Sequence, residues 1–114
     1  MSSKNKQIIK KMIQEANVIE ELIEGYNLEK FIADERTKRA ACMTLINIGE
    51  LSKNLSEDFK KDYNFVAWRA IAGMRDVTAH KYQTLKMGDV WVTLITDIPK
   101  LKEQLNIIYI EIDS

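Results

Sequence analysis

Apolar side chains recur every three or four residues along most of this chain, the spacing that places them on one face of an α-helix. The first such stretch covers about residues 4 to 24 and ends at Gly25, a residue type that commonly terminates helices. A second helix is predicted from Leu28 to Leu51. Its half from Ala40 onward is apolar on nearly all sides, which indicates burial against more than one surface. In so small a chain the second surface is expected to belong to another subunit, so a homodimer is predicted.

The C-terminal half shows the same periodicity with clearer interruptions. Ser56 precedes two acidic residues and is expected to cap a short helix or turn. Asn64 is predicted to cap a third helix that starts with the next residue, and a last helix is expected over residues 90–108. Pro99 lies inside that last helix and should kink it rather than end it, because the apolar spacing resumes at once. The predicted fold class is all-α, an antiparallel bundle of four or five helices.

Length and composition fit one ordinary globular domain over residues 1–114, with a single hydrophobic core. Lys+Arg and Asp+Glu number 17 each, so there is no general attraction to nucleic acid and any RNA contact must be local. The lone Cys42 lies in an apolar run and is expected to be a buried thiol. Because no apolar run approaches the roughly 18 residues that a membrane span requires, a cytoplasmic location without membrane contact is predicted.

The candidate catalytic residues lie in the segment over residues 68–82. His80 is the only histidine of the chain. It lies five positions after Arg75, about 140° around an ideal helix, so these two residues do not share a face. Asp76 and His80 are four apart and do share one, so Asp76 is expected to orient the imidazole. Tyr82 would return to the side of Arg75 if the helix continues. No H-E-x-x-H or C-x-x-C spacing occurs, and neither a metal nor another cofactor is expected.

Spacing alone leaves simpler interpretations open for each of these residues. A single histidine near a helix C-terminus more often stabilises the helix dipole than it catalyses. Tyr82 is more simply a packing aromatic with a solvated hydroxyl, and Trp68 and Trp91 are more simply core anchors than platforms for stacking bases. The charged run over residues 34–39 is more simply a solvated helix face.

Several segments, taken together and in order, resemble the HepT-like family of HEPN domains over about residues 34 to 105. The core signature is intact: Arg, a polar residue, three further residues, His, one residue and Tyr. Three positions depart from the usual pattern: Lys81 replaces a small residue, Ala67 replaces Pro, and Met43 stands where Arg is frequent. The matching segments are Ile48-Gly49-Glu50 and Leu55-Ser56, then Trp68-Arg69-x-Ile71-x-Gly73-Met74-Arg75-Asp76-x-x-x-His80-x-Tyr82, then Val90-Trp91 and Asp97-Ile98-Pro99-x-Leu101.

The resemblance implies a metal-independent endoribonuclease that acts on RNA as a homodimer within a prokaryotic toxin–antitoxin system. Arg75 and His80 would be the catalytic residues, with Asp76 in support. The partner would be a minimal nucleotidyltransferase antitoxin of the MntA type, which adenylylates Tyr82. One alternative is a non-catalytic HEPN module that binds a nucleotide or a partner for a nucleotidyltransferase. A plain helical dimerisation protein is the other.

Overall fold

The computed structural model describes the backbone of residues 3–81 and 84–113, and the side chains of residues 3–75 and 84–113. In this part of the chain all regular structure is helical, which confirms the all-α fold class. The long helices are α1 (Ser3–Ile23), α3 (Glu35–Lys53), α5 (Trp68–Lys81) and α7 (Ile98–Asp113). The shorter elements are α2 (Leu28–Ala33), α4 (Glu57–Asp62), α6 (Met87–Val92) and the π-helical segment η2 (Thr93–Asp97).

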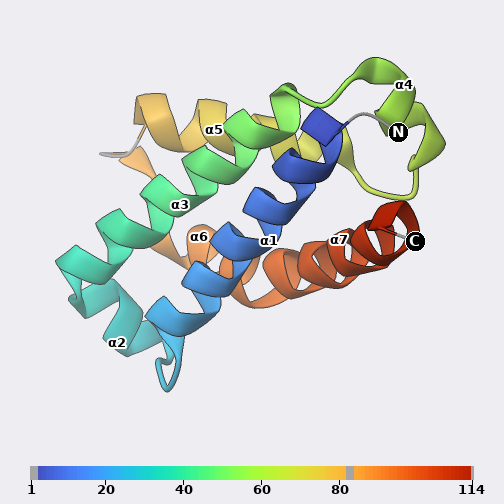
Figure 1. Cartoon of the computed structure of the whole chain (residues 1–114). Coiled ribbons are helices and arrows are strands. Elements are labelled where there is room, and N and C mark those ends of the chain that lie inside the picture. Colours follow the sequence, from blue (N-terminus) through green and yellow to red (C-terminus); the bar gives the residue numbers. More distant parts are fainter. Residues whose placement is uncertain (1–2, 82–83, 114) are drawn as a thin grey trace.

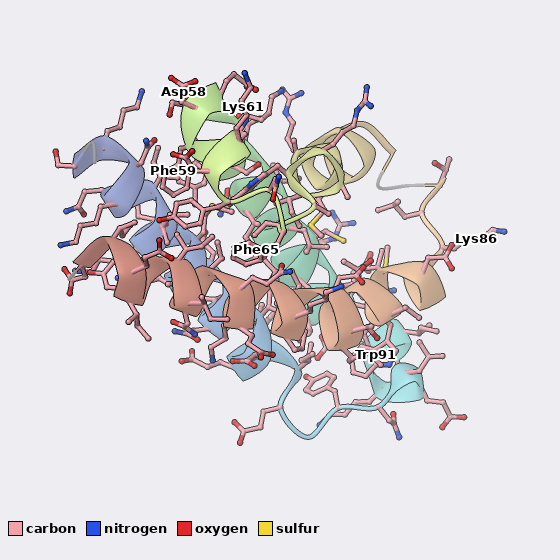
Figure 2. The ribbon with its side chains drawn as sticks, turned by 90° about the vertical axis from the view of Figure 1, so that its right-hand side faces the viewer. Asp58, Phe59, Lys61, Phe65, Lys86 and Trp91 are labelled. Atoms are coloured by element: carbon pink, nitrogen blue, oxygen red, sulfur yellow. The ribbon has the colours of Figure 1, made fainter. Side chains whose placement is uncertain are left out.

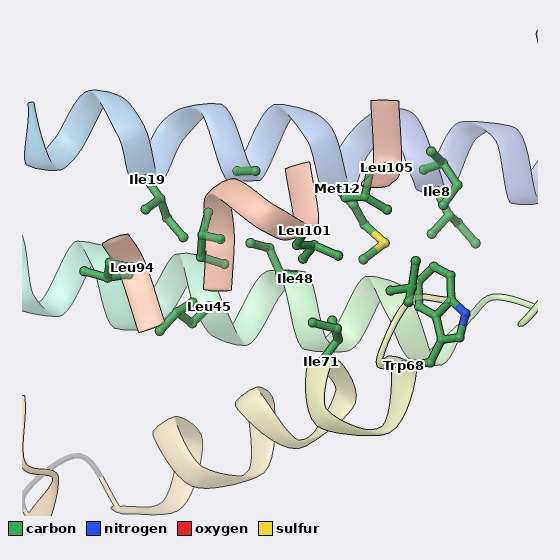
Figure 3. Close-up of a cluster of buried hydrophobic side chains, with 14 of the residues drawn as sticks. Ile8, Met12, Ile19, Leu45, Ile48, Trp68, Ile71, Leu94, Leu101 and Leu105 are labelled. Atoms are coloured by element: carbon green, nitrogen blue, oxygen red, sulfur yellow. The ribbon is translucent and has the colours of Figure 1, made fainter. Parts of the chain in front are cut away.

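The long helices form an antiparallel bundle in which α3 lies between α1 and α5, while α1 also packs against α7 (Figure 1). The two ends of the chain lie at the same end of the bundle, where Lys6 and Asp113 form an ion pair. Figure 3 shows how buried side chains of α1, α3, α5 and the C-terminal helices meet between the ribbons. Burying each large aliphatic side chain contributes about 1.5–3 kcal/mol, so this shared core fixes α5 against α3.

Both tryptophans are anchors of this core, as predicted. Trp68 is buried, and its indole nitrogen donates a hydrogen bond of 3.0 Å to the carbonyl oxygen of Tyr63. Trp91, labelled in Figure 2, is half-buried where α6 packs against α2. Its ring centroid lies 5.2 Å from that of Phe31. Cys42 is also buried, as expected.

The prediction of one helix from Leu28 to Leu51 is wrong, because Asp34 separates two helices, α2 and α3. The backbone of Asp34 is extended, and its carboxylate accepts hydrogen bonds from the backbone nitrogen of Thr37 at 3.0 Å and from the hydroxyl of Tyr26 at 2.6 Å. An aspartate that satisfies the first free N–H groups of a new helix competes with helix continuation. The first residue of the charged run 34–39 is therefore a helix cap, not part of a solvated face.

Other helices of the same chain bury most of the apolar half of α3. Ala41, Cys42, Leu45 and Ile48 are buried between the neighbouring helices, whereas Met43 remains 56% exposed. Packing of α3 against both α1 and α5 accounts for the all-round apolar pattern without a second subunit. The homodimer therefore stays a prediction.

The later helix boundaries follow the sequence in part. Ser56 caps α4 by accepting a hydrogen bond of 3.2 Å from the backbone nitrogen of Phe59, as predicted. Asn64 does not cap the next helix, since α5 begins only at Trp68, after a turn in which Val66 is buried. The chain remains helical through Pro99, and the preceding segment η2 absorbs the irregularity by an i-to-i+5 bond from the Ile98 nitrogen to the Thr93 carbonyl. No helix in the described part is both long and apolar enough to cross a membrane.

Candidate functional site

Helix α5 carries three of the four residues of the predicted site on one continuous backbone. It runs from Trp68 to Lys81, so Arg75, Asp76 and His80 keep the four- and five-residue helical spacings that the sequence predicted. The side chains of Asp76 and His80 lie outside the described part, and Tyr82 lies outside the described residues altogether. The roles of these three residues stay predictions, and Arg75 is the predicted site residue whose side chain the structure describes.

Arg75 forms an ion pair with Glu50 of α3. Its Nε donates to the carboxylate oxygen Oε1, and the two side chains are 33% and 48% exposed, respectively. A guanidinium is permanently charged and planar, so a bond at Nε sets the plane in which both Nη atoms lie. The pair thus leaves Arg75 near solvent but restricts the direction of its charged end.

Gly49 lets the two helices approach each other closely beneath this ion pair. A β-carbon at this position would lie 2.7 Å from the Cβ of Arg75, 2.8 Å from its backbone nitrogen and 3.2 Å from the carbonyl oxygen of Ile71. These distances are too short for any side chain, so only glycine fits without moving α5. The hydroxyl of Ser52, itself buried, donates a hydrogen bond of 2.8 Å to the carbonyl oxygen of Gly49. One turn of α5 therefore rests directly on the backbone of α3.

Hollows lie beside the helices of this site. A groove of about 470 Å³ between α1 and α3 has a polar lining that includes Lys11, Glu15, Asn47 and Glu50. A second cleft, of about 450 Å³, lies between α5 and the start of the C-terminal helices and is lined mainly by apolar side chains. Lys86 stands at its edge and projects away from the beginning of α6 (Figure 2). Hollows of this size can hold a nucleotide or a similar small molecule.

Glu50 and Gly49 were not singled out for chemistry by the sequence, where they appeared only as part of a family segment. A signal was present, since a glycine inside a helix costs about 1 kcal/mol relative to alanine and leaves room for a close contact. That signal points to a close approach of another helix, but it does not identify Arg75 as the group that approaches. Only the three-dimensional structure shows that Arg75 is the residue that approaches Gly49.

Other candidate chemistry in the described part of the chain is weak. Burial raises the pKa of the Cys42 thiol, which keeps it protonated and unsuited to nucleophilic attack. Among the described side chains, no group of three or more His, Cys, Asp or Glu residues is arranged to hold a metal ion. Arg75 and its seat on α3 are thus the best-defined functional candidate.

The all-helical bundle is consistent with the class of HEPN domains. Within that class, the chain belongs to the family described as ribonuclease HepT-like, whose model matches residues 12–108. This membership supports ribonuclease function. The resemblance stated from the sequence is confirmed at the level of the family.

Relatives with ribonuclease names match most of the chain. The "Probable ribonuclease HepT" of Thermococcus cleftensis is 34% identical over 102 residues, which cover 90% of this chain and 93% of the relative. A protein named "Putative RNase" of Caldanaerobacter subterraneus subsp. tengcongensis is 35% identical over 94 residues, covering 82% of this chain and 84% of the relative. No solved structure matches this chain.

Proposed function

We propose that this protein is a metal-independent endoribonuclease that uses the 2′-hydroxyl of its RNA substrate as the nucleophile. The proposal rests on one observation in a chain of the ribonuclease HepT-like family: Arg75 packs against α3 and is ion-paired there. The only histidine of the sequence, His80, lies on the same helix as Arg75. RNA supplies its own nucleophile, so the protein needs only to position it, move protons and stabilise charge on the phosphate.

In the proposed reaction the 2′-oxygen forms a bond to phosphorus as the bond from phosphorus to the 5′-oxygen breaks. His80 transfers protons, because imidazole changes its protonation near neutral pH; such transfer contributes about 10²–10⁴ in rate. The proton lost by the 2′-hydroxyl is balanced by the one gained by the departing 5′-oxygen. Arg75 binds the phosphate oxygens with its planar, permanently charged group, and Asp76 orients His80. The products carry a 2′,3′-cyclic phosphate and a 5′-hydroxyl.

Cleavage of a labelled mixed-sequence RNA by the purified protein tests this function. Arg75→Ala and His80→Ala should abolish cleavage while circular dichroism shows unchanged helix content. Arg39→Ala is the matched control, because Arg39 is also an arginine paired with a carboxylate, that of Glu35, but lies on the exposed surface of α3. DNA of the same sequence should remain intact. Full activity in the His80 or Arg75 variant would remove that residue from the mechanism.

We further propose that the protein is the toxin of a toxin–antitoxin system, acts as a homodimer and is silenced by a nucleotidyltransferase antitoxin that adenylylates Tyr82. In the dimer the two Arg75–His80 segments would face each other across one groove. Adenylylation would add bulk and negative charge close to that groove and compete for the cation of Arg75. Sedimentation velocity of the purified chain tests the dimer, and growth arrest on expression, absent in Arg75→Ala, tests the toxin.

The second candidate is a non-catalytic module that binds a nucleotide or a partner for a nucleotidyltransferase. The cleft of about 450 Å³ beside α5 favours it, since its apolar lining and polar edge suit a nucleobase. Calorimetric titration with ATP and AMP, together with the cleavage assay, separates the two candidates. Nucleotide binding without any RNA cleavage would favour the module, and cleavage that depends on Arg75 would favour the enzyme.

A further inference from the structure

We infer that Glu50 is a positioning residue that holds the guanidinium of Arg75 in the orientation needed to bind an RNA phosphate. The inference rests on the proposed ribonuclease function and assigns a role to a residue that the family signature around His80 does not include. Two independent contacts support it: the ion pair between Glu50 and the Nε of Arg75, and the close approach of the Arg75 backbone to Gly49.

These two contacts together fix both ends of the arginine side chain. The backbone nitrogen and Cβ of Arg75 rest against Gly49, so the root of the side chain cannot shift without moving α5. At the other end, the Glu50 carboxylate binds Nε. An arginine otherwise has several rotatable bonds, and ordering it before the substrate arrives reduces the entropic cost of reaching the transition state.

The ion pair between Glu50 and Arg75 is expected to contribute little to the stability of the fold. Both side chains are a third or more exposed, and exposed ion pairs contribute little to folding stability. Glu20 of α1 and Lys102 of α7 form a comparable bridge between helices, with side chains 43% and 30% exposed and an N···O distance of 2.6 Å. That pair serves as an internal reference, because its loss should cost the fold as much as loss of the Glu50 pair.

Glu50 also borders the polar groove between α1 and α3, so its carboxylate can be removed without creating a buried void. Substitutions at this position are therefore expected to fold. Glu50→Gln keeps an oxygen that can accept from Nε but loses the charge, whereas Glu50→Ala loses both. The expected order of cleavage rates is wild type, then Glu50→Gln, then Glu50→Ala.

The test measures kcat and KM for cleavage of a labelled RNA by wild type, Glu50→Ala, Glu50→Gln and the control Glu20→Ala. Misplacement of a substrate-binding group by about 1 Å can cost roughly 10²-fold in rate. Glu50→Ala should therefore lower kcat about 10- to 100-fold with little change in KM, while its melting temperature matches that of Glu20→Ala. The decrease should be equal across pH 5 to 8, because a positioning residue exchanges no proton with the substrate.

A double-mutant cycle tests whether Glu50 acts through Arg75. Arg75→Lys keeps the charge but lacks the planar fork that Glu50 orients. In this background, Glu50→Ala should cause no further loss, and a full additional loss would overturn the inference. Loss of one limb of the pH profile would overturn it too, by making Glu50 a proton carrier.

The measurements distinguish failure of the positioning role of Glu50 from failure of the ribonuclease function. If wild type cleaves RNA, Arg75→Ala does not, and Glu50→Ala equals Glu20→Ala, only the positioning role is overturned. If wild type does not cleave RNA, the ribonuclease function is overturned and the positioning role with it.

Discussion

A β-carbon placed on Gly49 would lie 2.8 Å from the backbone nitrogen of Arg75, so the two helices that carry these residues touch backbone to backbone. The contact lies directly beneath the ion pair between Arg75 and Glu50. A close helix contact of this kind transmits any change in α3 to the position of the arginine, because packed interiors do not deform at low cost. The glycine is therefore a structural requirement of the site.

Gly49→Ala is expected to displace α5 and weaken the fold. The atoms it would meet belong to the backbone and Cβ of Arg75, which cannot move away by rotating a side chain. Overpacking of this kind costs about 1–3 kcal/mol. RNA cleavage should fall as well, because the root of Arg75 shifts. Urea unfolding measures the first effect and the cleavage assay the second.

Gly73→Ala is the matched control, since Gly73 lies in the interior of α5 and no described atom lies within 4 Å of the position of its missing Cβ. Alanine in a helix interior is favoured over glycine by about 0.5–1 kcal/mol. Both substitutions gain this propensity, so Gly49→Ala should be about 1–3 kcal/mol less stable than Gly73→Ala. Equal stabilities would show that α3 and α5 are not in close contact at Gly49.

The sequence predicted the helices well where one apolar face and a clear end coincide. The first helix, expected over residues 4 to 24, is α1 (Ser3–Ile23), and Gly25 follows it with a positive φ of 78°. The break at Asp34 was missed because helical periodicity continues across it, and only the hydrogen bonds of the cap with Thr37 and Tyr26 show that the chain turns there. Local pattern cannot decide between an aspartate on a helix surface and one that starts a new helix.

Only the part of the candidate site that lies on α5 could be predicted from the sequence. The spacing of Arg75, Asp76 and His80 lies within one segment, and α5 preserves it. The pairing of Arg75 with Glu50 joins residues 25 positions apart, and it depends on how α3 packs against α5. Pairings of that kind come from tertiary packing, which periodicity does not encode.

The fold should lose the contribution of Asp34 in acid. Hydrogen bonds from Tyr26 and Thr37 lower the pKa of its carboxyl from 3.8 to about 2. A carboxylate with a lowered pKa in the folded state stabilises the fold above the unfolded value, near pH 4, and this contribution disappears as the pH falls through about 2. Thermal unfolding between pH 5 and pH 2 should therefore show a loss of stability that Asp34→Asn removes.

Asn is the informative replacement because it can still cap α3 but does not titrate in this range. Asp62→Asn, which removes an exposed carboxylate on α4, is the control for the loss of one negative charge. If Asp34→Asn and wild type lose stability in parallel below pH 4, the carboxyl of Asp34 does not carry this effect.

RNA cleavage should persist undiminished in excess EDTA. The proposed mechanism takes its nucleophile from the 2′-hydroxyl and its phosphate binding from Arg75, so no step requires a divalent cation. The measurement compares initial rates on an unstructured RNA with EDTA and with added Mg²⁺, and a metal-dependent nuclease run in parallel verifies chelation. Activity that appears only with added divalent ion would contradict the metal-free mechanism.

If the proposed silencing is correct, co-expression with a minimal nucleotidyltransferase of the MntA type should attach AMP to Tyr82 and abolish cleavage, because the added phosphate would compete for the charge of Arg75. Peptide mass spectrometry locates the modification, and Tyr82→Phe should stay unmodified and active. The other three tyrosines provide internal controls: Tyr63 is buried, Tyr109 is half-buried, and the hydroxyl of Tyr26 is bound to Asp34. AMP found on one of these, or inhibition that persists in Tyr82→Phe, would show that silencing does not act through position 82.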